Sequence, residues 1–310
     1  MSTAFYYHED FLLHDSGPFH PESPDRLKAI LRGLKRDLWK DLIHKRPNPA
    51  SEGEILRVHS KEHFDEMRES ARNGPVQIDM DTRVSPKSFD AAMLAAGAAV
   101  QAVSAIMEGE FQNAFAAVRP PGHHATTSRA MGFCLFNNIA VAARHLTTKY
   151  SLNRVLIVDW DVHHGNGTQE IFYDDPSVVY ISLHKKNHYP GTGWEDERGT
   201  GKAAGTKINF PIGPPFSADR YEQIFAEALE RARAFAPKFI LISCGFDAHE
   251  RDPLGNLALK SETYGKLTRL VRQFASDFGH QRIFSILEGG YDPTALAESA
   301  ASHVENLMEK

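Results

Sequence analysis

The sequence has few cysteines, no surplus of positive charge and no long uninterrupted apolar run. It has two cysteines in 310 residues, Cys134 and Cys244, and both stand in apolar surroundings. Two cysteines exclude a disulfide framework and a zinc site made of thiolates, and such sparing use is typical of a reducing compartment. We therefore expect a cytoplasmic protein.

The charge balance and the apolar segments exclude two classes of partner. Lys plus Arg number 35 against 40 Asp plus Glu, so the formal net charge is −5 and we expect no direct contact with nucleic acid. The start, MSTAFYYHEDFLLHD, lacks the basic beginning and long apolar core of a signal peptide. No stretch is apolar enough to cross a membrane. Residues 90–107 come closest, but Gln101 and Ser104 interrupt them and favour a packed helix.

The order of apolar segments predicts the fold class. No linker divides the chain, so we expect one domain over residues 1–310. Short β-branched runs alternate with longer segments of helical period, which predicts an α/β fold with a parallel sheet. The expected strands are 114–118, 155–159, 178–183, 239–244 and 283–287. The expected helices are 88–108, 219–235, 261–277 and 293–308, and 184–206 is an expected long loop.

Each expected strand leads directly into polar residues. These are RPPGHH, DWDVHHG, His184, GFDAHERD and EGGYD, in chain order. In an open parallel sheet, ligands bind outside the carboxyl ends of the strands. The five polar segments therefore indicate one shared site.

The stretch VLIVDWDVHHGNGTQ at 155–169 indicates a metal site. Side chains two apart on extended backbone face the same way, so Asp161 and His163 can bind one divalent ion, with Asp159 behind them. Asp247, directly after the fourth strand, is the best candidate for a third ligand. Two aspartates and one histidine leave coordination open for water and substrate, as in catalytic zinc sites. Taken singly, a buried acid–histidine pair and a helix cap by Asp247 remain alternatives.

Two further motifs fit chemistry beside such a metal. His123 and His124 follow a rigid Pro-Pro-Gly turn and could take a proton from a metal-activated water, although an isolated histidine pair is more often a surface feature. Gly289 and Gly290 would let Tyr291 enter the site, where its hydroxyl could donate a hydrogen bond to an oxyanion. An ordinary core tyrosine after a glycine turn is the alternative.

Taken together and in this order, the motifs resemble those of the histone deacetylase superfamily of zinc-dependent amidohydrolases. They are RPPGHHA, GFCLFNN, DWDVHHGNGTQ, ISLH, GFDAHERDPLG and EGGYD, with HPESPDRL near residue 20 and DMDTRVSPKSFDAAMLAAGA near residue 80 also fitting. The wording DWDVHHGNG resembles the class II branch and its bacterial relatives. The resemblance implies the arginase/deacetylase fold, in which a central eight-stranded parallel sheet lies between helices.

The resemblance also implies roles for single residues. The metal ligands it implies are Asp161, His163 and Asp247, and the implied catalytic residues are His123 and His124 as tandem general base and acid and Tyr291 as the residue that polarises the substrate carbonyl. Asp159 matches the carboxylate behind His123. Asn166 stands where class I relatives have an aspartate behind His124, so His124 should be less easily kept protonated.

Cofactors follow from the same resemblance. It implies Zn²⁺, with Fe²⁺ as an alternative, and a structural K⁺ bound by Asp159, Asp161, His163, Ser182 and Leu183. Two-metal arginase relatives have further aspartates where this chain has Gly165 and His249. The resemblance therefore implies one catalytic metal.

The implied substrate enters through a narrow tunnel. Gly132, Phe133 and Tyr189 match its walls, and Leu254 stands where some acetylpolyamine-selective relatives have a glutamate. This favours an acetylated lysine-like amine over an acetylpolyamine or another small acylated amine. A non-catalytic acyl-lysine binding module is a third alternative, and a homo-oligomer stays open. The expected reaction is metal-assisted hydrolysis of the amide, which releases acetate.

Overall fold

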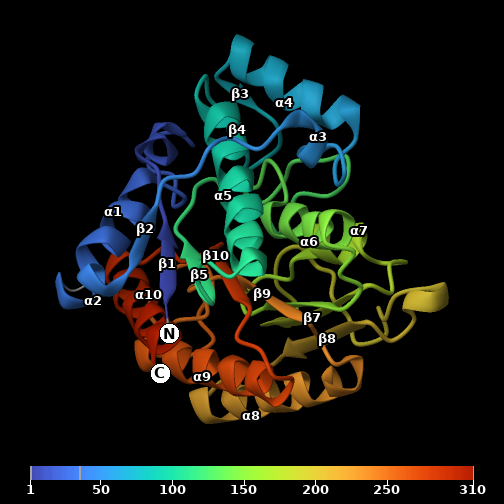
Figure 1. Ribbon diagram of the computed structural model, residues 1–310. Helices are drawn as coiled ribbons and strands as arrows, with labels where there is room; N and C mark the ends of the chain where they lie inside the picture. The colour runs from blue at the N-terminus through green and yellow to red at the C-terminus, as the bar shows by residue number, and fades with distance from the viewer. Residues whose placement is uncertain (1, 35, 310) are drawn as a thin grey trace.

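The computed structural model describes residues 2–34 and 36–309 (Figure 1). Its main sheet has eight parallel strands in the order β2-β1-β5-β10-β9-β6-β7-β8. The strands are β1 (Thr3–Tyr6), β2 (Ile43–Lys45), β5 (Asn113–Ala116), β6 (Val155–Asp159), β7 (Val178–Lys185), β8 (Lys207–Ile212), β9 (Phe239–Cys244) and β10 (Ile283–Leu287). This confirms the expected α/β fold with a central eight-stranded parallel sheet.

Helices cover both faces of this sheet. Figure 1 shows α5 and α6 on one side, and α8, α9 and α10 on the other. The helices are α1 (Pro24–Gly33), α2 (Arg36–Asp41), α3 (Glu52–Ile55), α4 (Lys61–Asn73), α5 (Ser88–Glu108), α6 (Asn138–Lys149), α7 (Asn166–Ile171), α8 (Ala218–Arg231), α9 (Ser261–Asp277) and α10 (Pro293–Met308). Short 3-10 helices are η1 (Glu9–Leu13), η2 (Gly201–Ala203) and η3 (Arg233–Phe235), and β3 (Val76–Gln77) pairs with β4 (Arg83–Val84) in a separate antiparallel ribbon.

The apolar runs explain the central strands. Every residue of β5, β6, β9 and β10 is buried, as expected for strands that are covered by helices on both faces. β6, β9 and β10 have the predicted bounds, as do α5, α9 and α10. Asp292 caps the start of α10, because its Oδ1 accepts the N–H of Ala295 at 2.7 Å.

Three predicted elements have other bounds in the structure. β5 ends at Ala116 instead of residue 118, and β7 continues through His184, which was expected to follow it. The segment 219–235 is not one helix, because α8 ends at Arg231 and η3 follows. β8, which is not among the expected strands, pairs with β7 and extends the ladder past His184 to Lys185.

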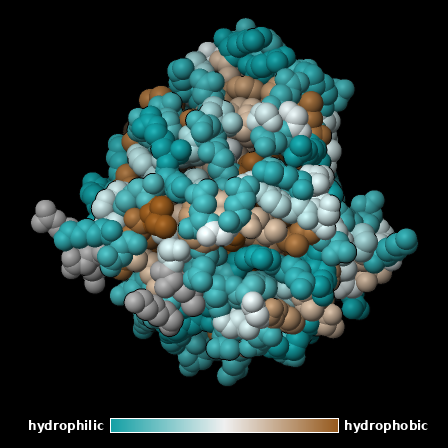
Figure 2. All heavy atoms as spheres, in the orientation of Figure 1, coloured by the Kyte–Doolittle hydropathy of each residue, from teal (hydrophilic) through white to brown (hydrophobic). Residues whose placement is uncertain are grey.

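The expectation that no stretch is apolar enough to cross a membrane is wrong for helix α5. It is long and apolar enough to cross one by length and composition, but 78% of its most apolar window is buried inside the fold. It packs as a core helix, as residues 90–107 were expected to do. In the view of Figure 2 the surface is mainly hydrophilic, with apolar residues in small separate patches.

Candidate active site

The three predicted metal ligands lie together at the carboxyl edge of the sheet. β6 and β9 are neighbours, and the segments after them bring Asp161 and His163 next to Asp247. His163 Nδ1 lies 3.0 Å from Asp161 Oδ1 and 3.1 Å from Asp247 Oδ2. The chain bends over residues 161–163 instead of staying extended. This bend, and not strand alternation, turns Asp161 and His163 to the same point.

The surroundings of the two carboxylates fit a bound cation. Asp161 Oδ2 accepts the N–H of Gly289 and Asp247 Oδ1 accepts the N–H of Val162, both at 2.8 Å. A Cβ on Gly289 would lie 2.0 Å from Asp247 Oδ2, so only glycine fits there. One ligand atom from each of Asp161, His163 and Asp247 falls within 4.8 Å of the others. Two buried carboxylates beside one imidazole match the oxygen and nitrogen ligands of an open catalytic metal site.

The charges of this triad depend strongly on one another. Burial raises the pKa of Asp161, but the positive charges of His123 and His163 hold it well below its usual range. Burial lowers the pKa of His163, but its hydrogen bonds to Asp161 and Asp247 raise it to about 10. A metal ion bound in place of the imidazole proton would supply the positive charge that stabilises the two carboxylates.

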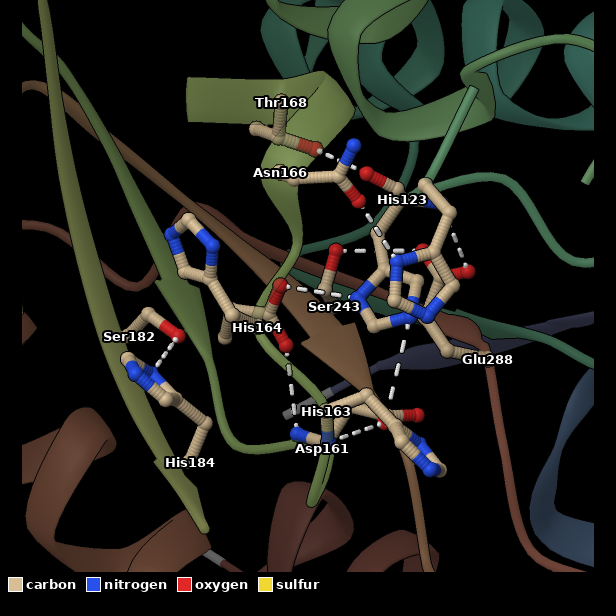
Figure 3. A network of polar contacts seen from close by, with 12 residues as sticks. His123, Asp161, His163, His164, Asn166, Thr168, Ser182, His184, Ser243 and Glu288 are labelled. Atoms are coloured by element: carbon tan, nitrogen blue, oxygen red, sulfur yellow. Dashed lines mark hydrogen bonds and ion pairs between the residues drawn. The ribbon is translucent and has the colours of Figure 1, made fainter. Parts of the chain in front are cut away.

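The tandem histidines lie next to the triad and differ in their partners. Figure 3 shows His123 beside Asp161. His123 Nδ1 lies 3.0 Å from Asp159 Oδ2, and His124 Nδ1 lies 2.8 Å from Asn166 Oδ1. The centres of the two imidazole rings are 4.0 Å apart, and His123 Nε2 is 3.8 Å from Asp161 Oδ1. The structure therefore brings together the four residues predicted here and places them against the ligands.

Their environments separate the pKa values of the two histidines. Burial lowers the pKa of His123, but the charges of Asp159 and Asp161 raise it to about 10. Burial lowers the pKa of His124 well below its usual value, and the charges of His123 and His163 lower it further. This direction agrees with the expectation from Asn166, because an amide supplies no negative charge to keep a proton on His124.

A cavity of about 240 Å³ opens onto these groups. All four predicted tunnel residues line it, together with His124, His163, Tyr291 and two residues that the sequence analysis did not single out; the full set is Asp81, His124, Gly132, Phe133, His163, His188, Tyr189, Leu254 and Tyr291. Gly132 has a φ of +56°, and a Cβ there would lie 2.5 Å from His124 Cδ2. Only glycine therefore allows this wall to approach the histidine so closely.

Tyr291 is held in the cavity wall by its backbone and its ring. Its N–H donates to Asp252 Oδ2 at 2.7 Å, and Asp252 Oδ1 accepts the N–H of Leu254 at 2.9 Å. The guanidinium of Arg26 lies 4.8 Å from the centre of the Tyr291 ring. Asp252 thus joins two parts of the cavity wall that are 37 residues apart along the chain.

Several supporting residues were missed. The Tyr180 hydroxyl donates to Asp159 Oδ2 at 2.9 Å, and the buried Glu288 accepts the N–H of His123 at 3.1 Å. Asp252 and Arg26 were not singled out either. Tyr291, which contacts both Asp252 and Arg26, and His123, which contacts Glu288, are remote from them in sequence, so spacing gave no signal. The only hint for these three residues was their place in the motifs GFDAHERDPLG, HPESPDRL and EGGYD.

The residues that match a potassium site lie side by side. Asp159 pairs with Ser182 across β6 and β7, and Leu183 follows on the same strand. Asp159 Oδ1 accepts the N–H of Asp161 at 3.1 Å. Gly165 lacks a side chain, and His249 accepts the N–H of Arg251 at 3.1 Å, so neither supplies a further metal ligand beside the triad.

The second histidine of DVHHG points away from the metal ligands (Figure 3). His164 Nδ1 lies 2.8 Å from Thr192 Oγ1, and His164 Nε2 lies 3.2 Å from Gln169 Oε1. Its ring packs against His184 at 4.8 Å. His164 therefore contacts the loop after β7.

Fold and site together define a class: an α/β protein of the arginase/deacetylase architecture in which three residues that could hold a metal ion lie beside paired histidines. A model of the histone deacetylase domain matches residues 20–307. The chain belongs to the histone deacetylase family.

The names of similar proteins indicate different substrates. A probable deacetylase of Archaeoglobus fulgidus is 39% identical over 94% of this chain and 82% of its own length. A histone deacetylase-like amidohydrolase of Pseudomonas aeruginosa is 35% identical over 98% and 86%. The human polyamine deacetylase HDAC10 is 39% identical over 99% of this chain but only 48% of its own length. The crystal structure of the HDA15 HD domain superposes with a TM-score of 0.93 at 39% identity, covering 99% of this chain and 88% of that one.

Proposed function

We propose that the protein is a zinc-dependent deacetylase that hydrolyses the amide of an acylated, lysine-like amine. The observation that carries the proposal is the meeting of three groups at one cavity: His163, which lies in the triad with Asp161 and Asp247, the neutral His124, and Tyr291. Family membership and the names of the relatives support the same class of reaction.

The metal and its ligands supply the first part of the chemistry. Asp161, His163 and Asp247 would hold the ion, and Zn²⁺ bound there supplies Lewis acidity and lowers the pKa of a water molecule. The same oxygen and nitrogen ligands also suit Fe²⁺. Metal analysis of the purified protein, followed by reloading with each ion, distinguishes the two.

His124 carries the proton in this proposal. Its Nδ1 faces the Asn166 carbonyl oxygen, which assigns the ring proton to Nδ1 and leaves the lone pair of Nε2 free to accept a proton. His124 takes a proton from the attacking water and gives it to the amine nitrogen as the C–N bond breaks. His123, held charged by Asp159, supports the developing negative charge, and the Tyr291 hydroxyl donates a hydrogen bond to the carbonyl oxygen. Acetate and a free amine are the products.

The cavity wall favours a lysine-like chain. Leu254, Phe133 and Tyr189 give it apolar sides suited to methylene groups, and Asp81 adds one acid. An acetylpolyamine is the second candidate, because HDAC10, which is named a polyamine deacetylase, is 39% identical to this chain. An apolar Leu254 offers a second ammonium group of a polyamine no charged partner.

Turnover by the metal-loaded protein tests the proposal. Acetate and free amine are measured with acetyl-lysine peptides, free acetyl-lysine, acetylspermidine and longer acyl-lysines, and the metal-free protein is the control. We expect the highest kcat/KM for an acetyl-lysine substrate. Tight binding of these compounds without acetate release would instead indicate an acyl-lysine binding module.

We also infer that K⁺ binds beside the triad, at Asp159, Asp161, His163, Ser182 and Leu183. Support comes from the pairing of Asp159 with Ser182 and from the buried carboxylates there. Replacing K⁺ by the bulky tetramethylammonium ion at constant ionic strength should lower the melting temperature of the protein. A cytoplasmic location stays a prediction.

A further inference from the structure

Glu288 lies at the carboxyl end of β10 and bridges the ends of two neighbouring strands. It is fully buried, and Figure 3 shows it close to His123 and Ser243. Its Oε2 accepts the N–H groups of Gly122 at 2.7 Å and His123 at 3.1 Å, while its Oε1 accepts the Ser243 hydroxyl at 3.1 Å. One carboxylate therefore holds the backbone of the tandem histidines against the end of β9.

The residues after Glu288 reach the other parts of the site. The N–H of Gly289 donates to the metal ligand Asp161 at 2.8 Å, and Arg26 Nε donates to the Gly290 carbonyl at 2.7 Å. Arg26 also donates to the carbonyl of Glu288 itself and lies over the ring of Tyr291. The backbone of each residue from Glu288 to Tyr291 is thus held by a hydrogen bond. This segment connects the contacts of the tandem histidines to Tyr291.

We propose that Glu288 is a positioning residue that sets the distance between the tandem histidines and Tyr291. The proposal rests on the proposed function, in which both groups act on one amide: His124 moves the proton and Tyr291 polarises the carbonyl. A displacement of about 1 Å between such groups can cost about 10²-fold in rate. Glu288 is not among the residues that line the cavity, so it acts through backbone and does not touch substrate.

Two substitutions separate position from charge. Glu288→Ala leaves the N–H groups of Gly122 and His123 without their acceptor, and we expect kcat to fall about 10²-fold with KM changed less than about threefold. In Glu288→Gln, the amide oxygen can accept both N–H groups and the amide NH₂ can donate to Ser243 Oγ. We therefore expect Glu288→Gln to recover most of the lost kcat.

Ser285→Ala is the matched control on the same strand. Ser285 Oγ lies 2.8 Å from His303 Nε2, so its removal also leaves a buried polar group unpaired, but away from the cavity. We expect it to lower the melting temperature without lowering kcat. An equal loss of stability in Glu288→Ala with an unchanged kcat would show a merely structural role and overturn the proposal.

Amide hydrogen exchange at Gly122, His123 and His124 gives a readout that needs neither metal nor turnover. We expect faster exchange in Glu288→Ala than in the wild type or Glu288→Gln. Equal kcat losses in the Ala and Gln variants would assign the effect to charge and overturn the proposal, as would unchanged exchange in Glu288→Ala. If the Ala variant does not fold, Glu288→Asp, which is one methylene shorter, takes its place. A metal-loaded wild type that hydrolyses no acylated amine refutes the proposed function, while the exchange data still decide the place of Glu288.

Discussion

At the scale of single residues, each of the tandem histidines has a partner that fixes its chemical state. Asn166 orients His124 without charging it, whereas Asp159 keeps a proton on His123. In the proposed mechanism the two adjacent histidines therefore have different roles: His124 is the neutral proton acceptor and His123 is a fixed positive charge. This division follows from their partners, because both histidines are buried.

Tyr291→Phe tests the polarising hydroxyl. We expect metal content to stay the same and kcat to fall roughly 10²–10³-fold, as for other donors to an oxyanion. Tyr264→Phe is the control, because its buried hydroxyl has no partner in the described structure and it does not line the cavity. Steady-state kinetics with metal analysis measure the effect, and near-normal turnover by Tyr291→Phe would remove the role assigned to it.

Leu254→Glu tests substrate choice at the cavity wall. A carboxylate there would pair with the second ammonium group of a polyamine, so kcat/KM for acetylspermidine should rise about tenfold relative to an acetyl-lysine peptide. Leu254→Gln has a similar size without charge and should change this ratio little. Competition between the two substrates measures it, and an unchanged ratio in Leu254→Glu would show that this position does not select the substrate.

At the scale of elements, the carboxyl ends of adjacent strands explain why the site could be found from the sequence. β6 and β9 lie side by side, so Asp161, His163 and Asp247 meet although 84 residues separate the last two. Apolar runs predicted these strands and their polar ends. β1 and β2 were missed because segments of four and three residues carry little periodic signal.

The supporting residues could not be predicted for a different reason. Arg26 and Glu288 belong to segments 262 residues apart, and only the folded arrangement brings them together. Helix α6 was not predicted. Its first residue, Asn138, is also the last residue of GFCLFNN, and this segment was interpreted as a motif and not as the start of a helical period. Sequence patterns thus indicated the candidate catalytic and metal-binding residues and their partners Asp159 and Asn166, but not the supporting side chains of Arg26 and Glu288.

The loop after β7 offers a test at this scale. Glu197 accepts the N–H groups of Gly193 and Trp194 and the side chain of Gln169, which contacts His164. This network ties down the loop that carries the cavity residue Tyr189.

Glu197→Ala should therefore loosen the cavity wall. We expect KM to rise about three- to tenfold, because each N–H left unpaired costs about 1 kcal/mol or more. Metal content should not change, since the network faces away from the ligands. Glu195→Ala, an exposed residue of the same loop, is the control. Limited proteolysis and steady-state kinetics measure the effect, and unchanged values of both would show that the loop is held by other contacts.

At the scale of the whole molecule, buried neutral histidines join distant parts of the fold. His59 Nδ1 faces the Thr126 carbonyl at 2.9 Å, and its Nε2 accepts the N–H of Asn137 at 2.9 Å. One ring nitrogen must donate and the other accept, so only the neutral imidazole satisfies both contacts. His303 lies between Thr268 and Ser285 in the same buried state.

These histidines predict how stability depends on pH. Burial lowers the pKa of both His59 and His303 to about 3, whereas in the unfolded chain a histidine titrates near 6.5. Between these two values the unfolded chain binds more protons, so the free energy of unfolding falls as pH falls from about 6.5 toward 3. Each histidine contributes a slope of about 1.4 kcal/mol per pH unit within this window.

Urea unfolding of the metal-free protein at a series of pH values measures this slope. We expect His303→Gln to reduce the slope by the contribution of one histidine, about 1.4 kcal/mol per pH unit. Above pH 7.5 each histidine is neutral in both the folded and the unfolded chain. The free energies of unfolding of the wild type and the variant should therefore change with pH in the same way there, which serves as the internal control. Equal slopes for the two proteins below pH 6 would mean that His303 accepts a proton within the fold. Its contacts with the Thr268 and Ser285 hydroxyls argue against this, because no carboxylate among the described residues contacts the ring to offset the burial of its charge.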